Sequence, residues 1–153
     1  MSDVRKNTLL MLSRRGYDVN ILESANEYFR LDKVLVVFIE DAKVSVGTIK
    51  TITTTIRKTN EELIVIVHSK PLTAEAKKVT KSNSIETFEY DEMAFDLLEV
   101  VPKHEKVLDV NVDCKRFPII RKTDAVCKYY NFKQNEIIKI YNDDNTIEYR
   151  RVC

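Results

Sequence analysis

The chain has 153 residues, which is enough for one ordinary domain or two small ones. Its net charge of +1 at pH 7 argues against a protein that binds polyanions over its whole surface. No stretch approaches the ~18 consecutive apolar residues of a membrane-spanning helix, and Ser2–Lys6 lead into a helix pattern rather than a signal peptide. We therefore expect a soluble intracellular protein.

The charge differs slightly between the two parts of the chain. Residues 1–99 carry 14 Lys/Arg and 16 Asp/Glu, a net −2, whereas residues 100–153 carry 11 and 8, a net +3. The C-terminal excess fits either a basic patch or scattered solvated charge. Three cysteines, Cys114, Cys127 and Cys153, show no CxxC spacing, so we expect reduced structural cysteines and no metal site or cofactor.

The N-terminal half predicts a sheet covered by helices. Ser2 is placed to cap a helix that runs to about Arg15 and is closed by Gly16. The apolar runs Val34–Ile39 and Leu63–Val67 do not alternate, which is typical of strands buried on both faces.

The segment from Ser45 to Thr59 fits two structures. Its many threonines favour a strand, whereas Val46, Ile49, Ile52 and Ile56 form one helical stripe. We predict a helix capped by Ser45, because a helix between two buried parallel strands completes a right-handed βαβ unit.

Three further elements are predicted before the boundary between the two domains. A short helix from Pro71 to about Val79 has Thr73 as its cap, Ile85–Tyr90 forms an edge strand, and Asp91–Ala94 forms a helical turn. We place the domain boundary within Glu99–Lys103, which gives domains 1–99 and 100–153.

The C-terminal domain is predicted to be small, with a helix followed by a hairpin. Asp124 caps the helix Ala125–Tyr130, and Asn131 occupies the left-handed closing position. Strands then run from Glu136 to Tyr141 and from Ile147 to Arg151, joined by the turn Asn142–Asn145. The fold class is α+β or α/β: a mixed sheet flanked by helices, then a two-layer α/β domain ending in a β-hairpin.

Five segments, in this order along the chain, resemble the fifth subunit shared by the eukaryotic nuclear RNA polymerases, a family that also has an archaeal form. They are Arg15-Gly16-Tyr17, Ser45-Val46-Gly47, Ile85-Glu86-Thr87-Phe88, Val101-Pro102-Lys103-His104 and residues 118–152. The resemblance covers nearly the whole chain and includes the N-terminal jaw domain that the archaeal form lacks. It implies a jaw domain with a restriction-nuclease-like fold and a C-terminal assembly domain.

Several positions depart from the family pattern. Ala125 replaces a proline after Asp124, Val44 replaces a proline before the Ser-Val-Gly segment, and asparagines replace glycines at 131 and 135. The family loop Thr-Pro-Ser-Ala corresponds to Thr73–Ala76. The segment between His104 and Pro118 is too short for the helix that the family carries there. These departures suit a shortened, diverged member, such as one encoded by a large DNA virus.

The resemblance implies a non-catalytic subunit of DNA-directed RNA polymerase, whose jaw domain lies beside downstream duplex DNA. The residues expected to face DNA stand at two helix starts, whose N–H groups attract phosphate: Ser45, Gly47, Lys50, Lys70, Thr73 and Lys77. On their own, Ser45 and Thr73 are equally consistent with simple helix caps, and the lysines with solvated charge.

The resemblance also implies that the C-terminal domain docks on the largest polymerase subunit. The docking candidates are Pro102, Lys103 and His104 at the hinge, then Pro118, Arg121, Asp124, Lys133, Tyr149 and Arg150. Each arginine also fits a solvated strand-edge charge, and Pro102 fits an ordinary linker proline. We expect the protein in the nucleus if it is cellular, and in a viral factory or virion if it is virus-encoded.

Two other functions are compatible with this sequence. Asp41-Ala42-Lys43 has the Asp-x-Lys spacing of Mg²⁺-dependent nucleases, but no further acidic residue stands in a suitable setting. A charged turn at a strand end explains it as well. The other alternative is a free-standing transcription regulator that binds a polymerase only transiently.

Overall fold

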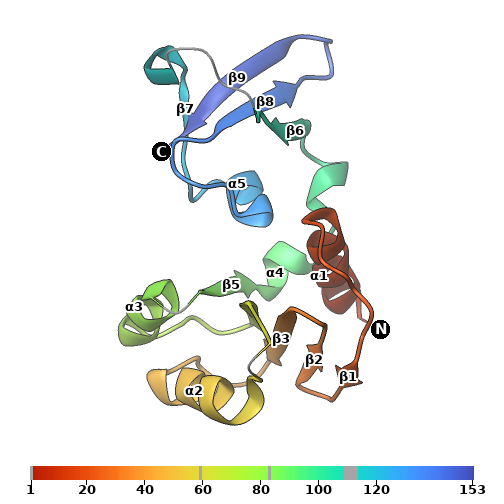
Figure 1. The fold of residues 1–153 in the computed structure, drawn as a ribbon, viewed down its shortest axis with the longest axis vertical. Helices are drawn as coiled ribbons and strands as arrows, with labels where there is room; N and C mark the ends of the chain where they lie inside the picture. The colour runs from red at the N-terminus through yellow and green to blue at the C-terminus, as the bar shows by residue number, and fades with distance from the viewer. Residues whose placement is uncertain (1, 59, 83, 109–113) are drawn as a thin grey trace. The chain divides into compact units, whose positions relative to one another are not determined.

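The computed structural model describes residues 2–58, 60–82, 84–108 and 114–153. The chain forms two compact units, the first ending at Phe95 and the second beginning at Asp96 (Figure 1). In the described residues no helix is both long and apolar enough to cross a membrane. The architecture is mixed α+β, with one mixed sheet in each unit.

The first unit contains a five-stranded sheet with the order β1-β2-β3-β4-β5. Its strands are β1 (Glu23–Ser24), β2 (Tyr28–Arg30), β3 (Val34–Ile39), β4 (Leu63–His68) and β5 (Ile85–Glu89). β3, β4 and β5 are parallel, whereas β1 and β2 add antiparallel pairs. The predicted βαβ unit and the edge strand are confirmed. β1 and β2 lie where the sequence indicated only a connection.

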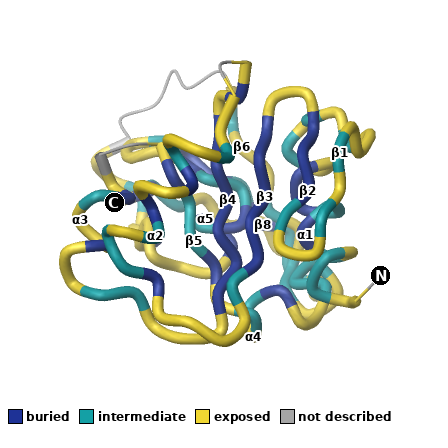
Figure 2. The backbone as a smooth tube through the Cα atoms, turned by 90° about the horizontal axis from the view of Figure 1, so that it is seen from below, coloured by how far each residue is buried: buried dark blue, intermediate teal, exposed yellow. Residues whose placement is uncertain are grey.

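Helices cover both faces of this sheet. Leu35 and Val37 of β3 pack in one cluster with Ile49 of α2 (Val46–Thr51) and Ala76 of α3 (Ala74–Ser82). On the opposite face, the Arg5 guanidinium of α1 (Asp3–Arg14) lies 4.6 Å from the centre of the Phe38 ring. β3 and β4 are buried almost throughout, as Figure 2 shows.

The N-terminal helix ends as predicted but begins differently. Gly16 adopts a φ of +91°, and the Tyr17 N–H donates to the Leu12 carbonyl, which closes α1 in the manner of a Schellman motif. Ser2 occupies the N-cap position, but its side chain makes no capping hydrogen bond. The prediction that Ser2 caps the helix through its side chain is therefore wrong.

The ambiguous threonine-rich segment is helical. α2 continues directly into a π-helix, η1 (Ile52–Ile56), and the threonine hydroxyls donate to carbonyls of the preceding turn instead of favouring a strand. Ile49 and Ile52 are buried and Ile56 is partly buried, which confirms the helical stripe at these positions.

The remaining helices of the first unit lie close to their predicted places. Thr73 caps α3 by accepting from the Ala76 N–H at 3.2 Å, and α3 runs to Ser82 rather than Val79. The predicted turn near Asp91 is α4 (Tyr90–Met93).

A buried ion pair ties the sheet to the end of η1. Arg30 is 5% exposed and Glu61 2% exposed, and their side chains are directly paired. Arg30 also donates to the Ile56 carbonyl at 2.8 Å and to Glu23 at 3.0 Å, while Glu61 accepts from the Lys58 N–H at 3.1 Å. The pair therefore joins β2 to the segment that follows the π-helix.

The second unit contains a four-stranded sheet with the order β6-β8-β9-β7. Its strands are β6 (Lys103–Lys106), β7 (Ile119–Ile120), β8 (Ile137–Tyr141) and β9 (Ile147–Val152). β8 and β9 form the predicted hairpin, and β7 runs parallel to β9. β6 and β7 were not predicted. Two 3₁₀ helices, η2 (Leu97–Glu99) and η3 (Cys114–Arg116), complete the unit; residues 109–113 of the shortened segment lie outside the described residues.

One helix covers one face of this second sheet. α5 (Ala125–Tyr130) places Val126 and Cys127 against Ile138, Ile140 and Val152. Asp124 caps α5 by accepting from the Val126 N–H at 3.0 Å, and Asn131 ends it in the left-handed conformation, as predicted. Tyr129 and Phe132 are buried and Tyr130 is partly buried, so these rings belong to the core.

Candidate nucleic-acid and partner-binding surfaces

The two helix starts predicted to face DNA lie side by side in the first unit. Val44 and Leu72 form a parallel β-bridge, and the Thr73 N–H donates to the Val44 carbonyl at 3.1 Å. This places Ser45 and Thr73 together at the carboxyl ends of β3 and β4. Both side chains already cap their helices, Ser45 through a capping box with Thr48.

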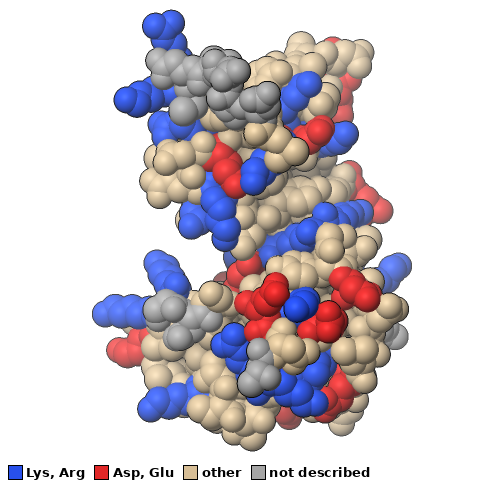
Figure 3. All heavy atoms as spheres, in the orientation of Figure 1, with Lys and Arg blue, Asp and Glu red and all other residues tan. Residues whose placement is uncertain are grey.

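The predicted lysines lie on the surface that these helices form. Lys50 and Lys77 are exposed, and the exposed Lys70 donates to the Asp41 carbonyl at 2.9 Å. Gly47 is exposed in the first turn of α2. α3 also carries Lys78 and Lys81, which were not predicted from the sequence, and Figure 3 shows basic side chains gathered at the edge of this unit where α3 lies.

The adjoining end of β3 carries negative charge. Glu40 and Asp41 are exposed there, and the Tyr90 hydroxyl donates to the Glu40 carboxylate at 3.2 Å. Burial and the Glu40 charge raise the pKa of Tyr90 to about 12. Among the described residues no three His, Cys, Asp or Glu side chains are grouped to hold a metal ion, so no observation favours the nuclease alternative at Asp41 and Lys43.

The three hinge residues lie inside the second unit. Pro102 precedes β6, and Lys103 and His104 pair within the sheet with Tyr141 and Ile140. His104 Nδ1 lies 2.7 Å from the Pro102 carbonyl oxygen, a contact that organises the start of the strand. The chain enters the second sheet at Lys103, directly after Pro102, and a hinge role for these residues stays a prediction.

Four docking candidates surround helix α5. Pro118 is exposed, and its carbonyl accepts from the Arg151 N–H at 2.9 Å. The Asp124 side chain caps α5. Lys133 is exposed and donates to the Asn131 side chain at 3.0 Å. Arg121 is exposed, and its carbonyl accepts from the Asp124 N–H.

The last two candidates belong to β9 and project to opposite faces, because successive strand residues alternate. Arg150 pairs with Glu148 at 3.1 Å. Tyr149 is 39% exposed on the face that α5 does not cover, and its ring stacks on Phe117 with centroids 5.7 Å apart.

The side of the sheet that α5 does not cover, which we call the open face, carries apolar and basic side chains among the described residues. Ile119 is 50% exposed and Ile147 48% exposed, and both lie here with Tyr149 by strand register. The ammonium groups of Lys103 and Lys139 lie 5.1 and 4.8 Å from the centre of the Tyr141 ring. Only Lys103 and Tyr149 of this face were predicted from the sequence. The alternation of side chains along the strand could have indicated this face. Ile147 and Tyr149 alternate with the positions that share the face of the buried Val152, so they point to the opposite face.

The cysteines show one buried and one exposed thiol in the described residues. Cys127 is buried in the second core, and burial raises the pKa of its thiol to about 11. Cys153 is free and exposed, so its expected structural role is not supported.

The second unit matches a known protein family. Residues 96–152 match the family described as RNA polymerase Rpb5, C-terminal domain. This match begins at the first residue of the second compact unit and ends one residue before the chain does. The second unit is thus similar to the Rpb5 C-terminal domain over nearly its whole length.

Related proteins extend the similarity beyond the Rpb5 domain. The chain is 27% identical over 154 aligned residues to the Caenorhabditis elegans protein "DNA-directed RNA polymerases I, II, and III subunit RPABC1", covering 88% of this chain and 72% of that protein. Two viral proteins are also similar: 028R of Frog virus 3, 28% identical over 52% of this chain and 54% of that protein, and 092R of Invertebrate iridescent virus 3, 32% identical over 46% and 42%. The resemblance inferred from the sequence is thereby confirmed, and relatives encoded by large DNA viruses exist.

Proposed function

We propose that this protein is a non-catalytic subunit of a DNA-directed RNA polymerase. The observation that carries the proposal is the Rpb5 C-terminal domain at residues 96–152, in a chain that aligns over 88% of its length with a named polymerase subunit. The protein contributes binding surfaces and no chemistry of its own. It acts in the nucleus if cellular, and in a viral factory or virion if virus-encoded.

The second unit docks on the largest polymerase subunit through the open face. The exposed Ile119, Ile147 and Tyr149 form an apolar centre, and isolated domains seldom leave such a cluster uncovered on a sheet. Lys139 and Arg151 add positive charge, and Lys103 pairs on this face with Glu105 at 3.6 Å. The matching surface of the partner is therefore apolar, with carboxylates opposite Lys139 and Arg151.

The first unit forms part of the lower jaw beside downstream duplex DNA. The starts of α2 and α3 are joined by the bridge between Val44 and Leu72. Lys50 lies in the last turn of α2, Lys70 precedes α3 and Lys77 lies within α3. Such an arrangement supports contacts with phosphates rather than the reading of bases.

The test is purification of the tagged full-length protein from its native cells, with washing at high salt and mass spectrometry of what remains. The two largest polymerase subunits should be recovered at one-to-one stoichiometry. Replacement of Tyr149 by Asp together with Ile147 by Asp should abolish their recovery, whereas Lys81→Glu, in the first unit, should not.

Two outcomes would contradict the proposal. Recovery of the protein alone, or with unrelated partners, would mean that the Rpb5 domain serves another role. Recovery of polymerase subunits at less than one-to-one stoichiometry, with their loss during the high-salt wash, would favour the free-standing regulator instead. Circular dichroism of the double variant establishes that the loss of binding is not a loss of folding.

A further inference from the structure

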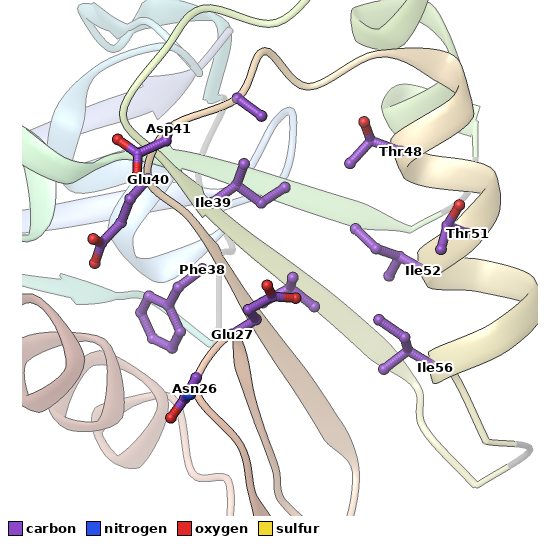
Figure 4. Close-up of a pocket in the computed structure, with 12 residues that line it drawn as sticks. Asn26, Glu27, Phe38, Ile39, Glu40, Asp41, Thr48, Thr51, Ile52 and Ile56 are labelled. Atoms are coloured by element: carbon purple, nitrogen blue, oxygen red, sulfur yellow. The ribbon is translucent and has the colours of Figure 1, made fainter.

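A hollow of about 660 Å³ opens in the first unit between the end of β3, the two residues before β2 and the helical segment α2–η1. Its walls include Ile39 from the strands and Ile52 and Ile56 from the helix, and Figure 4 shows the two helical isoleucines pointing toward the strands. Asn26 and Phe38 also line it, and Arg5 of α1 donates to the Asn26 carbonyl and lies 4.6 Å from the centre of the Phe38 ring.

The hollow lies where the pairing of β2 with β3 ends. The pairing of β2 with β3 stops at Tyr28 and Val37, and only the bond from the Phe38 N–H to the Glu27 carbonyl continues it. Ile39 and Ile56 pack against the core cluster here but remain partly exposed.

The π-helix shapes the opposite wall. The Arg57 N–H donates to the Ile52 carbonyl at 2.9 Å, five residues back. Residues four apart lie on the same face of a helical segment. Ile52 and Ile56 therefore form a continuous apolar wall along the hollow.

Carboxylates stand at this apolar wall. Glu27 is exposed, and its side chain points into the hollow toward Ile52 (Figure 4). Asp41 and Glu40 lie at the end of β3 where the hollow opens. Within the described residues the carboxylates of Glu27 and Asp41 have no hydrogen-bond or ion-pair partner, although the Lys70 ammonium lies 2.9 Å from the Asp41 carbonyl oxygen.

We propose that this hollow is a docking site for a short basic segment of a protein partner. A lysine or arginine side chain would lay its aliphatic stem against Ile39, Ile52 and Ile56 and bring its cation to Glu27. Apolar neighbours in the partner segment would cover the rest of the wall. The open rim and the rows of aliphatic side chains suit a polypeptide rather than a fully enclosed small molecule.

This surface differs in chemistry from both surfaces described above. The helix layer with Lys50 and Lys77 attracts phosphate, and the open face of the second unit attracts carboxylates, whereas the hollow attracts cations. It therefore predicts an additional protein contact that does not depend on polymerase membership.

The full-length protein is titrated with a fluorescent hexapeptide in which leucine alternates with arginine or lysine, and its ¹H–¹⁵N spectrum is recorded. The amide signals of Glu27, Ile39 and Thr51 should shift, and the same peptide with glutamate in place of the basic residues should not bind. Glu27→Lys should weaken binding at least tenfold, and Thr51→Lys, which adds a cation at the helical wall, should weaken it too.

Glu62→Lys serves as the matched control, because Glu62 is an exposed carboxylate of the same unit outside the hollow. Its affinity for the basic peptide should be unchanged. An equal loss of affinity in this control would show that the effect comes from net charge alone, and would overturn the proposal. Shifts spread over the surface, or the same shifts and affinity with spermidine alone, would also overturn it. Since the isolated chain is used, failure here leaves the polymerase role untouched.

Discussion

A single left-handed residue determines where helix α5 ends. Asn131 has a φ of +54°, a conformation that costs ordinary L-residues about 1–2 kcal/mol and that asparagine tolerates better than most. The Phe132 N–H then donates to the Cys127 carbonyl at 2.9 Å, which directs Phe132 into the core. The backbone at position 131 therefore links the end of the helix to core packing.

Asn131→Ala should lower the free energy of unfolding of the second unit by about 1 kcal/mol, because alanine lacks this tolerance. Asn131→Gly should change it by less than about half that amount, since glycine adopts the same conformation freely. Urea unfolding followed by tyrosine fluorescence measures both. Gln134→Ala, at an exposed neighbour, is the control, and an equal loss in Asn131→Gly would show that the side-chain bonds of Asn131 matter more than its backbone.

The Glu23 carboxylate links stability to pH. Hydrogen bonds from Tyr28, Arg30 and Lys58 lower the pKa of Glu23 from 4.5 to about 2. Because the folded-state pKa lies below the unfolded one, this contribution is complete above about pH 4.5 and is lost as the pH falls toward about 2. Acid should therefore weaken the bonds between β1 and β2.

Glu23→Gln should make the stability of the first unit less dependent on pH between about pH 5 and about pH 2.5. Denaturant unfolding at a series of pH values measures the slope. Glu62→Gln, at a surface ion pair with Lys33, should retain the slope of the original protein. If both variants keep the original dependence of stability on pH, Glu23 is not the group that makes stability depend on pH.

At the scale of elements, the Arg30–Glu61 pair is the main constraint on the β2 edge of the first sheet. Removing one member of a buried pair leaves the other charge without a partner, which typically costs 3–5 kcal/mol. Glu61→Ala should lower the free energy of unfolding by about 3 kcal/mol, measured by chemical denaturation. Glu62→Ala, in the exposed pair with Lys33, should cost less than about 1 kcal/mol.

The double variant Arg30→Met with Glu61→Leu is compared with Glu61→Ala. An apolar pair of similar volume leaves no buried charge, so stability should recover most of the loss seen in Glu61→Ala. A double variant no more stable than Glu61→Ala would show that the bond from Arg30 to the Ile56 carbonyl contributes more than the ion pair.

The elements that could be predicted are those whose signal lies within their own residues. The run Val34–Ile39 is buried almost throughout, and Asp124 and Asn131 mark the two ends of α5. The helix at Ser45 needed an additional argument from the βαβ connection, because its threonines favour strand locally. Its continuation as a π-helix had no recognisable signal.

The elements that could not be predicted are short strands formed by tertiary pairing. β1, β2 and β7 have two or three residues each, too few for any periodicity to show. β6 has the sequence Lys-His-Glu-Lys, which carries no apolar alternation because it lies at the sheet edge. The hollow beside Glu27 depends on where β2 stops, so no local pattern in the chain indicated it.

At the scale of the whole molecule, the surfaces are distributed over separate units with separate cores. The open face belongs to the unit that matches the Rpb5 C-terminal domain, and the lysines of α2 and α3 belong to the other. Substitutions in one unit therefore should not unfold the other, and each proposed contact can be removed alone.

The proposed contact with DNA is opposed by nearby negative charge, because Glu40 and Asp41 lie at the end of β3, where the Lys70 ammonium is 2.9 Å from the Asp41 carbonyl oxygen. We predict that Lys50→Glu combined with Lys70→Glu weakens the grip of the assembled polymerase on downstream duplex DNA without unfolding the subunit. Each lost phosphate contact lowers the slope of log K against log salt by about 0.9, so two contacts should reduce it by about 2. Filter binding over a range of salt concentrations measures this slope.

The matched control is Lys6→Glu combined with Lys33→Glu, which makes the same change in charge at exposed positions on α1 and before β3. If the helix layer faces DNA, only the first pair changes the slope. Equal changes in both would indicate a diffuse effect of net charge. An unchanged slope in both would place Lys50 and Lys70 in solvent, and Ser45 and Thr73 would then act only as helix caps, because their hydroxyls already accept from helix N–H groups.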